Sequence, residues 1–203
     1  MPTEPRHLFG SLRTPHASCV LPTADQPPKP QPLPVAIRWM IHRDLPAVQN
    51  IKLACFPDSP WGEEEFIRCL RQRYVIGMVA DTTVCDGEYH GDVVCAYMIY
   101  ESHPNRIHLA NFAVHPAYQR RSVGSQMVAK LASKLTPDGR NRILTEIRKT
   151  NLAAQLFFKS QQFRAQQVLR DFWNTGEDAY LMQRRFSSTP DRFPHDYHGC
   201  RGK

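Results

Sequence analysis

The sequence contains no long apolar run. No stretch of the 203 residues approaches the roughly 18 consecutive apolar residues that a membrane-spanning helix needs. The first residues, "MPTEPRHLFGSLRTPHASCV", also lack the continuous apolar stretch of a secretory signal peptide. We therefore expect a cytoplasmic protein with no membrane partner.

Cysteine is present, but never in the spacing of a metal site. The six cysteines, at positions 19, 55, 69, 85, 95 and 200, form no C-x-x-C pair and have no histidine at metal-ligand spacing. Cys55, Cys69 and Cys95 stand among apolar neighbours, where a free cysteine behaves as a small hydrophobe. We expect reduced thiols and no metal, and the pattern argues against a cysteine nucleophile.

Acidic residues are fewer than basic residues. Nineteen Asp and Glu face 26 Lys and Arg, which gives a net charge of +7 and a pI near 9.3. Such a balance favours acidic partners, phosphates among them, and says nothing about the fold. The balance is equally consistent with general solubility, and we expect no direct nucleic-acid binding.

Proline divides the chain into three parts. Residues 1–34 hold nine of the 17 prolines. Because proline does not fit helix interiors or central strands, we expect this segment to be a disordered arm. A proline-rich ligand for a recognition domain is the alternative. Residues 187–203 form a second polar tail broken by prolines. Residues 35–186 are long enough for one well-buried domain.

Residues 35–186 alternate between strand and helix patterns, which predicts a mixed α/β fold. The predicted order is β-α-α-β-β-β-α-β-α-β-β. The strands are expected at 35–40, 74–81, 92–101, 106–114, 142–149, 165–173 and 178–186, and the helices at 43–57, 58–72, 122–135 and 152–163. Asp58 or Ser59 is expected to cap the second helix, with Pro60 in its first turn.

The strand "RILTEIRK" has a clear two-residue alternation. Ile143, Thr145 and Ile147 fall on one face, and Leu144, Glu146 and Arg148 on the other. Glu146 is thereby expected opposite the apolar face. A carboxylate in this position is either an unremarkable edge-strand side chain or a proton acceptor.

The stretch "AVHPAYQRRSVGSQMV", residues 113–128, runs from a strand through a turn to a helix start. The first N–H groups of a helix have no intrahelical acceptor and carry the positive end of its dipole. Arg120 and Arg121 add positive charge, and Gly124 allows close approach of the backbone. This arrangement predicts an anion site, with an ordinary helix start bearing solvated arginines as the alternative.

These segments resemble the GNAT superfamily of acetyl-CoA-dependent N-acetyltransferases. Gln119–Ser125 matches the family's pyrophosphate loop, Q/R-x-x-G-x-G/A, except that Ser122 replaces the first glycine. "CFPDSPWGEEEF" and "TEIRKTNLAAQLFFKSQQF" are similar to segments of the branch that acetylates the N-terminal alanine of ribosomal proteins. The resemblance covers about residues 35–186. It implies a mostly antiparallel twisted sheet, splayed between strands 4 and 5 and flanked by about four helices.

The resemblance also implies a site. The anion would be the pyrophosphate of acetyl-CoA, and strand 107–114 would supply main-chain groups to the pantetheine arm. The implied cofactor-binding residues are Phe112, Ala113, Val114, Arg120, Arg121, Ser122, Val123, Gly124, Ser125 and Asn151. The side chains of residues 112–114 could equally belong to the core, and Asn151 could be a plain helix N-cap. The Cβ of Ser122 restricts positive φ, while its hydroxyl could donate to a phosphate.

The implied catalytic residue is Glu146, acting as general base for direct attack of an amine on the thioester. The family's proton donor, a tyrosine, is replaced by Phe158, which has no proton to give. His108, expected on the same strand face as Phe112, and Tyr180 are candidate substitutes; an ordered water is another.

The expected activity is acetyl transfer to a protein N-terminal α-amine, with alanine of a ribosomal protein as one acceptor, by a monomer or homodimer. Two alternatives stay open: a GNAT enzyme that acetylates a small-molecule amine, and a catalytically weak acyl-CoA-binding module.

Overall fold

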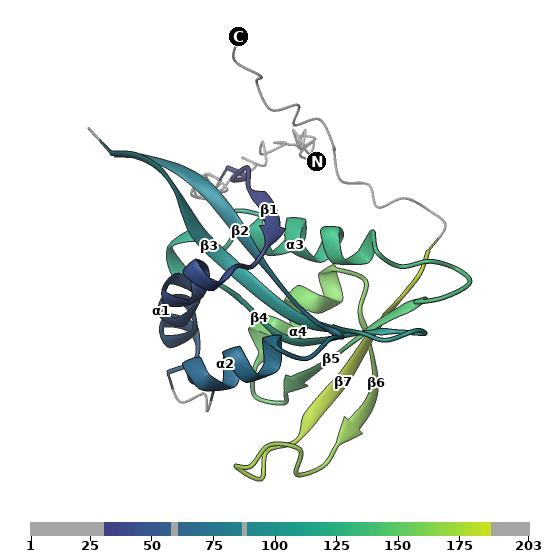
Figure 1. The fold of residues 1–203 in the computed structure, drawn as a ribbon. Helices are drawn as coiled ribbons and strands as arrows, with labels where there is room; N and C mark the ends of the chain where they lie inside the picture. The colour runs from purple at the N-terminus through teal and green to yellow at the C-terminus, as the bar shows by residue number, and fades with distance from the viewer. Residues whose placement is uncertain (1–30, 58–60, 87–88, 188–203) are drawn as a thin grey trace, which may run out of the picture.

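The computed structural model describes residues 31–57, 61–86 and 89–187. The elements follow the predicted order (Figure 1), with two short 3₁₀ helices in addition. They are β1 (Ala36–Trp39), η1 (His42–Asp44), α1 (Leu45–Cys55), α2 (Glu63–Leu70), β2 (Val75–Asp86), β3 (Tyr89–Ser102), β4 (Ile107–Val114), η2 (Pro116–Tyr118), α3 (Val123–Ala132), β5 (Arg142–Arg148), α4 (Leu152–Ser160), β6 (Arg164–Leu169) and β7 (Ala179–Arg185).

The strands of the described residues form one sheet in the order β1-β2-β3-β4-β5-β7-β6. Every neighbouring pair is antiparallel except β4 and β5, which are parallel and pair at only two positions. The mixed α/β fold, the four α-helices and the splay between strands 4 and 5 are confirmed.

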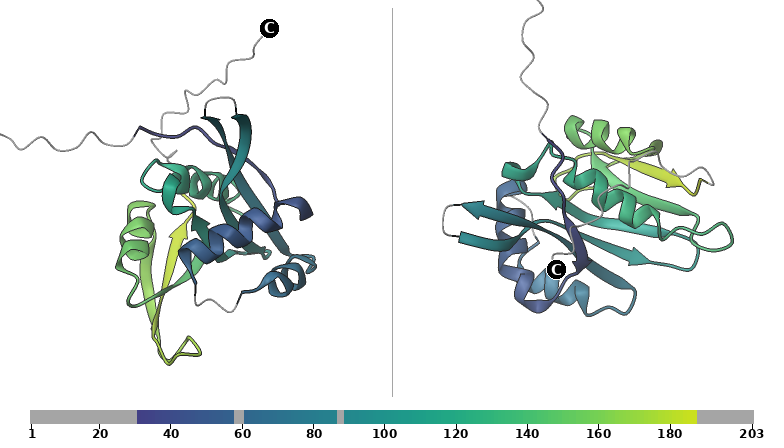
Figure 2. Two further views of the ribbon diagram at one scale, coloured as in Figure 1. Left: turned by 90° about the vertical axis from the view of Figure 1, so that its left-hand side faces the viewer. Right: turned by 90° about the horizontal axis from the view of Figure 1, so that it is seen from above.

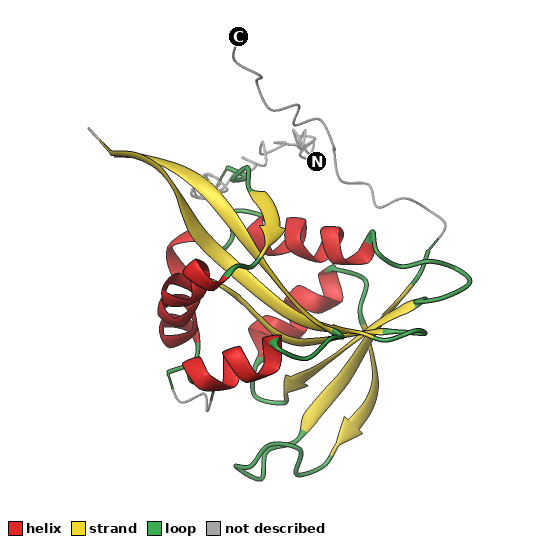
Figure 3. Cartoon of the chain, in the orientation of Figure 1, coloured by secondary structure: helices red, strands yellow, loops and turns green. Residues whose placement is uncertain are grey.

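Helices cover both faces of the sheet, as the views in Figures 2 and 3 allow the reader to follow. On one face, α3 and α4 contribute Met127, Leu131 and Phe158 to a core cluster that includes Ile107 and Ile143. On the other face, α1 and α2 pack through a second cluster. Its members include Leu45, Val48, Ile51, Phe66, Val79, Tyr97, Ile99 and Ala113. We call these the α3/α4 face and the α1/α2 face.

Two predicted boundaries are wrong, and a third prediction is not tested. The polar stretch 82–91 was expected to join two strands, but its residues 82–86 belong to β2 and its residues 89–91 to β3, because the antiparallel register continues from Thr82 through Asp86. The strand expected at 165–173 ends at Leu169, and the chain turns at Asp171, where φ is 49°. The predicted first turn of the second helix, with Asp58, Ser59 and Pro60, lies outside the described residues.

Helix α2 begins instead after Gly62. The backbone N–H of Gly62 donates to the Glu65 carboxylate at 3.0 Å, as in a capping box. Glu63, Glu64 and Glu65 occupy the first turn, where negative charge is favoured by the helix dipole. These three glutamates therefore stabilise the start of α2.

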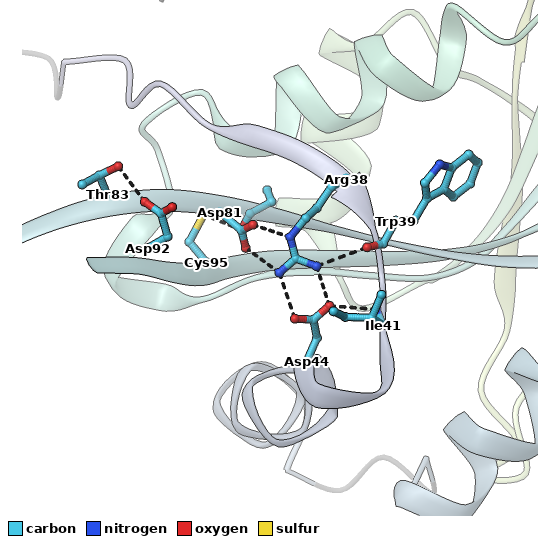
Figure 4. A network of polar contacts seen from close by, with 9 residues as sticks. Arg38, Trp39, Ile41, Asp44, Asp81, Thr83, Asp92 and Cys95 are labelled. Carbon is cyan, nitrogen blue, oxygen red and sulfur yellow. Dashed lines mark hydrogen bonds and ion pairs between the residues drawn. The ribbon is translucent and has the colours of Figure 1, made fainter. Parts of the chain in front are cut away.

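Arg38 joins β1 to two other elements (Figure 4). Its guanidinium donates to both carboxylate oxygens of Asp44, at 2.6 and 2.8 Å, and to Asp81 of β2 at 2.6 Å. Asp44 is 4% exposed, and its carboxylate also accepts from the backbone N–H of Ile41 at 2.8 Å. The network fixes the start of α1 against the edge of the sheet.

Residues 31–34, which the sequence analysis assigns to the proline-rich arm, lie within the described chain. The backbone N–H of Leu33 donates to the carbonyl of Arg121 at 2.9 Å, and the Leu33 carbonyl accepts from Gln126 Nε2 at 2.7 Å. The Pro34 carbonyl accepts from Thr82 Oγ1 at 3.3 Å. The segment before β1 is thus attached to the loop and helix that carry the predicted anion site.

Candidate active site

The site is built around a wedge between β4 and β5. The two strands pair only at Ile107 with Ile143 and at His108 with Leu144. One further link follows, a hydrogen bond of 3.1 Å from Thr145 Oγ1 to the Leu109 carbonyl. Beyond it the strands have no backbone pairing. Main-chain groups of β4 on this side are therefore available to an added ligand.

A bulge in β4 changes which side chains share a face. In the register with β3, Tyr100 pairs with Leu109 and Ile99 with Asn111, so Ala110 is an extra residue. Ile107, Leu109 and Phe112 consequently all pack on the α3/α4 face, where strict alternation would place Phe112 opposite Leu109. The expectation that His108 shares a face with Phe112 is wrong, because the bulge reverses the alternation between them.

The loop between η2 and α3 has the conformation of an anion site. Arg120 and Ser122 both have positive φ, 61° and 63°, and Ser122 is the N-cap of α3. Among the described residues, no backbone N–H from Arg120 to Ser125 has an assigned acceptor. Several amides at the positive end of α3 are thus unpaired, as phosphate binding requires.

Ser122 adopts the left-handed turn despite its Cβ, with φ 63° and ψ 6°. This conformation costs a non-glycine residue about 1 kcal/mol. The chain therefore keeps the backbone shape that the family's glycine provides. The exposed serine hydroxyl lies beside the unpaired amides and is free to donate, since its side chain makes no capping hydrogen bond.

Arg120 and Arg121 supply the positive charge expected of them. Arg120 is exposed and Arg121 is half-buried. Within the described part of the chain, neither guanidinium forms an ion pair with a carboxylate. Two uncompensated cations next to unpaired amides favour a doubly charged ligand such as a diphosphate.

The other loop residues have packing roles that the sequence did not reveal. Val123 is fully buried, so only its backbone could reach a ligand. A Cβ on Gly124 would lie 3.1 Å from the ring of Phe157 and 3.4 Å from that of Phe112, so the missing side chain makes room for these rings. Ser125 Oγ accepts from Gln161 Nε2 at 3.1 Å, which ties α3 to the end of α4.

Residues 112–114 and Asn151 also have structural partners. The Phe112 ring packs against those of Phe157 and Phe158 at centroid distances of 5.9 and 6.2 Å, and Ala113 is buried under α1. Their side chains belong to the core, so only main-chain groups that are not already paired could bind a ligand; the Val114 carbonyl already accepts from Cys55 Sγ and Gln119 Nε2. Asn151 caps α4, because its Oδ1 accepts from the Ala154 N–H at 3.0 Å.

Glu146 lies at the narrow end of the wedge, on the α1/α2 face. The predicted alternation of β5 is confirmed: Ile143, Thr145 and Ile147 are buried, and the intervening side chains are half-buried. The Glu146 side chain is 17% exposed, and its Oε2 lies 2.6 Å from His108 Nε2. A half-buried carboxylate here could accept a proton from a group in the wedge.

Phe158, at the position of the family's tyrosine, is 6% exposed and packs against Phe112, Phe157 and Phe163. Tyr180, opposite Ile147 in the register, packs against the same cluster on the α3/α4 face. Of the two candidate donors, only His108 touches Glu146. Its other neighbour, Glu101, was not identified from the sequence, although the β3–β4 register places Glu101 directly opposite His108.

The thiols fit the expectation of inert cysteines where they are described. Cys55, Cys69 and Cys95 are free, and burial raises the pKa of each. Cys55 Sγ donates to the Val114 carbonyl at 3.2 Å. Within residues 31–57, 61–86 and 89–187, no group of three or more His, Cys, Asp or Glu side chains could hold a metal ion, and no helix is long and apolar enough to cross a bilayer.

The model of the acetyltransferase (GNAT) family matches residues 45–163, which include the wedge and the loop 119–125. The chain belongs to this family. A relative in Salmonella typhimurium, [ribosomal protein bS18]-alanine N-acetyltransferase, is 29% identical over 143 residues, which are 68% of this chain and 89% of the relative. The GNAT match does not extend to residues 1–44 or 164–203.

Solved structures of other GNAT proteins share the fold. The ribosomal-protein-S18-alanine N-acetyltransferase from Escherichia coli is 24% identical, covers 79% of this chain and 99% of its own, and has a TM-score of 0.62. The NatC complex bound to Gag peptide and CoA contains a chain that is 13% identical, covering 75% of this chain and 99% of its own with a TM-score of 0.59. At these identities the likeness concerns the fold.

Proposed function

We propose that this GNAT protein transfers the acetyl group of acetyl-CoA to the N-terminal α-amine of a protein. The observation that carries the proposal is the position of Glu146, a half-buried carboxylate at the narrow end of the β4–β5 wedge. Among the described residues, the amides of loop 120–125 have no backbone acceptor, and Arg120 and Arg121 form no ion pair with a carboxylate. Acetyl-CoA supplies an activated acyl group as a thioester. The residues present fit its diphosphate, because charge and geometry in the loop both favour such an anion.

In the proposed mechanism, Glu146 receives a proton from the acceptor ammonium, directly or through one water. An ammonium has no lone pair, so attack on the thioester carbonyl requires the neutral amine. An N-terminal α-amine, with a pKa near 7.7–8.0, loses its proton far more readily than a lysine with a pKa near 10.4. The departing thiolate has a pKa of about 8.5, so protonation by water is sufficient where Phe158 offers no hydroxyl.

The acceptor is proposed from the relatives. The Salmonella typhimurium relative is named for the alanine of ribosomal protein bS18. We therefore propose an N-terminal alanine, as in a ribosomal protein, as the preferred acceptor of this chain. The net charge of +7 would assist approach to an RNA-bearing assembly at low ionic strength.

A peptide panel tests the proposal. Purified protein and acetyl-CoA are incubated with peptides that begin with Ala, Ser, Gly or Met, and products are identified by mass spectrometry. An Ala-initiated peptide with a free N-terminus should be acetylated on its α-amine. The same peptide with a blocked N-terminus but a free lysine should not react.

The panel also separates the alternatives. Spermidine and free amino acids are included as small-molecule acceptors, and reaction with these alone would contradict the proposed protein acceptor. The phenyl ring of Phe158 favours one further alternative, an acyl-CoA-binding module with little catalysis. Tight acetyl-CoA binding with no acetylated product in any reaction would support that module and overturn the enzyme.

A further inference from the structure

Four titratable side chains lie in a row on the α1/α2 face, next to the wedge. His108 of β4 is in the middle: its Nε2 is 2.6 Å from Glu146 Oε2, and its Nδ1 is 3.6 Å from Glu101 Oε2 at the end of β3. His103 Nε2 contacts the same Glu101 oxygen at 2.8 Å. All four side chains are between 17% and 29% exposed. The row runs from the proposed general base to the end of the β3–β4 hairpin.

The hydrogen bond between His108 and Glu146 has a defined direction. An ionised carboxylate only accepts, so His108 Nε2 must carry the hydrogen that it donates to Glu146. Glu101 on the other side of the ring favours a second proton on Nδ1. Consistent with this, the pKa of His108 is raised, chiefly by its hydrogen bond to Glu146 and also by the charges of Glu146 and Glu101, against an opposing effect of burial.

We propose that His108 is a positioning residue for Glu146. This inference rests on the proposed function. His108 binds Oε2 of Glu146 and thereby directs the other carboxylate oxygen, Oε1, toward the acceptor amine or its water. Glu101, held in turn by His103, keeps the imidazole ring in the required orientation. Glu146 stands on the strand that leaves the sheet at the wedge, so a contact from the neighbouring strand restricts its rotamer.

Two further groups complete the environment of this row. Cys69 of α2 faces Glu101, and burial together with the Glu101 charge raises its pKa, so the thiol stays neutral through the physiological range. Tyr74 lies against the His103 ring at a centroid distance of 5.5 Å. Among the described groups facing His108, the two carboxylates are therefore the charges that determine its protonation.

Substitution of His108 tests the positioning role. His108→Leu removes the donor, and we expect kcat with an Ala-initiated peptide to fall roughly 10- to 100-fold while KM for acetyl-CoA stays within about twofold. His108→Gln keeps an N–H donor near the place of Nε2 and should recover most of the lost kcat. Exposed His42, in η1, provides the matched control: His42→Leu should leave kcat unchanged. Wild-type kcat in His108→Leu, or equal losses in the Leu and Gln variants, would overturn the proposal.

The pH dependence gives a readout that a purely structural role would not produce. Because the folded-state pKa of His108 is raised, the charged hydrogen bond is complete at low pH and weakens as pH rises through that pKa. The acceptor amine titrates identically with both proteins, so its effect cancels when wild-type kcat is divided by the kcat of His108→Gln. This ratio should decline with rising pH in the same range; a ratio independent of pH would contradict the role assigned to the imidazolium.

A measurement without turnover separates this inference from the proposed function. The ring protons of His108 are titrated by NMR in the wild type and in Glu146→Gln, without substrate. The pKa of His108 should be lower in the variant, since the amide carries no charge. An unchanged pKa would show that the pair does not form, whatever the enzyme acetylates. A lowered pKa together with absence of acetyl transfer to any peptide would leave the contact in place and refute the function on which its role depends.

Discussion

Ser122 shows how one side chain can depart from a family pattern without losing the backbone shape. It holds φ 63° at the N-cap of α3, where glycine would pay no Cβ penalty. We predict that Ser122→Gly binds acetyl-CoA at least as tightly as the wild type. Ser122→Val should bind at least about tenfold more weakly, because a β-branched residue strongly disfavours this region. Calorimetry with acetyl-CoA measures both, and equal affinities for all three proteins would contradict the loop's role.

At the residue scale, the sequence predicted the face of Glu146 but not that of His108. Strand β5 follows strict two-residue alternation, so counting from Ile143 and Ile147 was sufficient. Strand β4 contains the extra residue Ala110, and that bulge arises from pairing with β3, which local sequence does not encode. The contact between His108 and Glu146 could therefore be found only from the three-dimensional register.

At the scale of elements, the segment before β1 contacts the proposed cofactor loop. Leu33 accepts from Gln126 of α3 and donates to the carbonyl of Arg121. We predict that a protein lacking residues 1–34 binds acetyl-CoA several-fold more weakly than one lacking residues 1–30, since only the longer deletion removes Leu33. Calorimetry on the two truncated proteins tests this. Matching affinities would mean that the contact does not stabilise the loop.

Gln126→Ala offers a milder version of the same change. It removes the 2.7 Å hydrogen bond to Leu33, worth about 1 kcal/mol, and a longer one of 3.4 Å to the Ser122 carbonyl, and it leaves the chain length intact. Combined with the longer deletion, it should add only a small further loss of affinity, because the Leu33 partner of its shorter hydrogen bond is already absent. A full additional loss would assign the effect of Gln126 to another contact.

At the same scale, helix and strand types were predictable and several ends were not. Apolar periodicity identified α3 and α4 because each buries one face against the sheet. Residues 82–86 and 89–91 were not predicted as strands because their pairing, and not their composition, makes them strands; Thr83 Oγ1 donates to Asp92 between the two strands at 2.8 Å. Strand β6 was predicted too long because the turn at Asp171 leaves no clear composition signal.

For the whole molecule, Arg38 is the polar contact that links the α1/α2 layer to the sheet edge. Removing it would leave the nearly buried Asp44 carboxylate without its main partner. We predict that Arg38→Met lowers the free energy of unfolding by about 3 kcal/mol. Urea unfolding of the wild type and the variant measures this difference in the free energy of unfolding. The exposed pair of Arg68 with Glu65, 3.8 Å apart, is the matched control, and Arg68→Ala should change stability by no more than about 0.5 kcal/mol.

The same network predicts that the free energy of unfolding falls at acid pH. The Arg38 hydrogen bonds hold the pKa of Asp44 below its usual value. The contribution of the Asp44 carboxylate to the free energy of unfolding is therefore present above its unfolded-state pKa, near 3.8. It is lost as the pH falls through the lower folded-state pKa. The stability difference between the wild type and Arg38→Met should shrink over that acid range; a constant difference would contradict the assignment.

Element order followed from hydrophobic periodicity, whereas the splay between strands 4 and 5 was implied only by the family resemblance.

The proposed function depends on the chemistry of the wedge, and Glu146→Gln tests it most directly. With an Ala-initiated peptide, kcat should fall by about 100-fold or more, while the dissociation constant for acetyl-CoA, measured by calorimetry, stays within about twofold. A variant that acetylates the peptide at the wild-type rate would contradict the central claim that Glu146 is the general base.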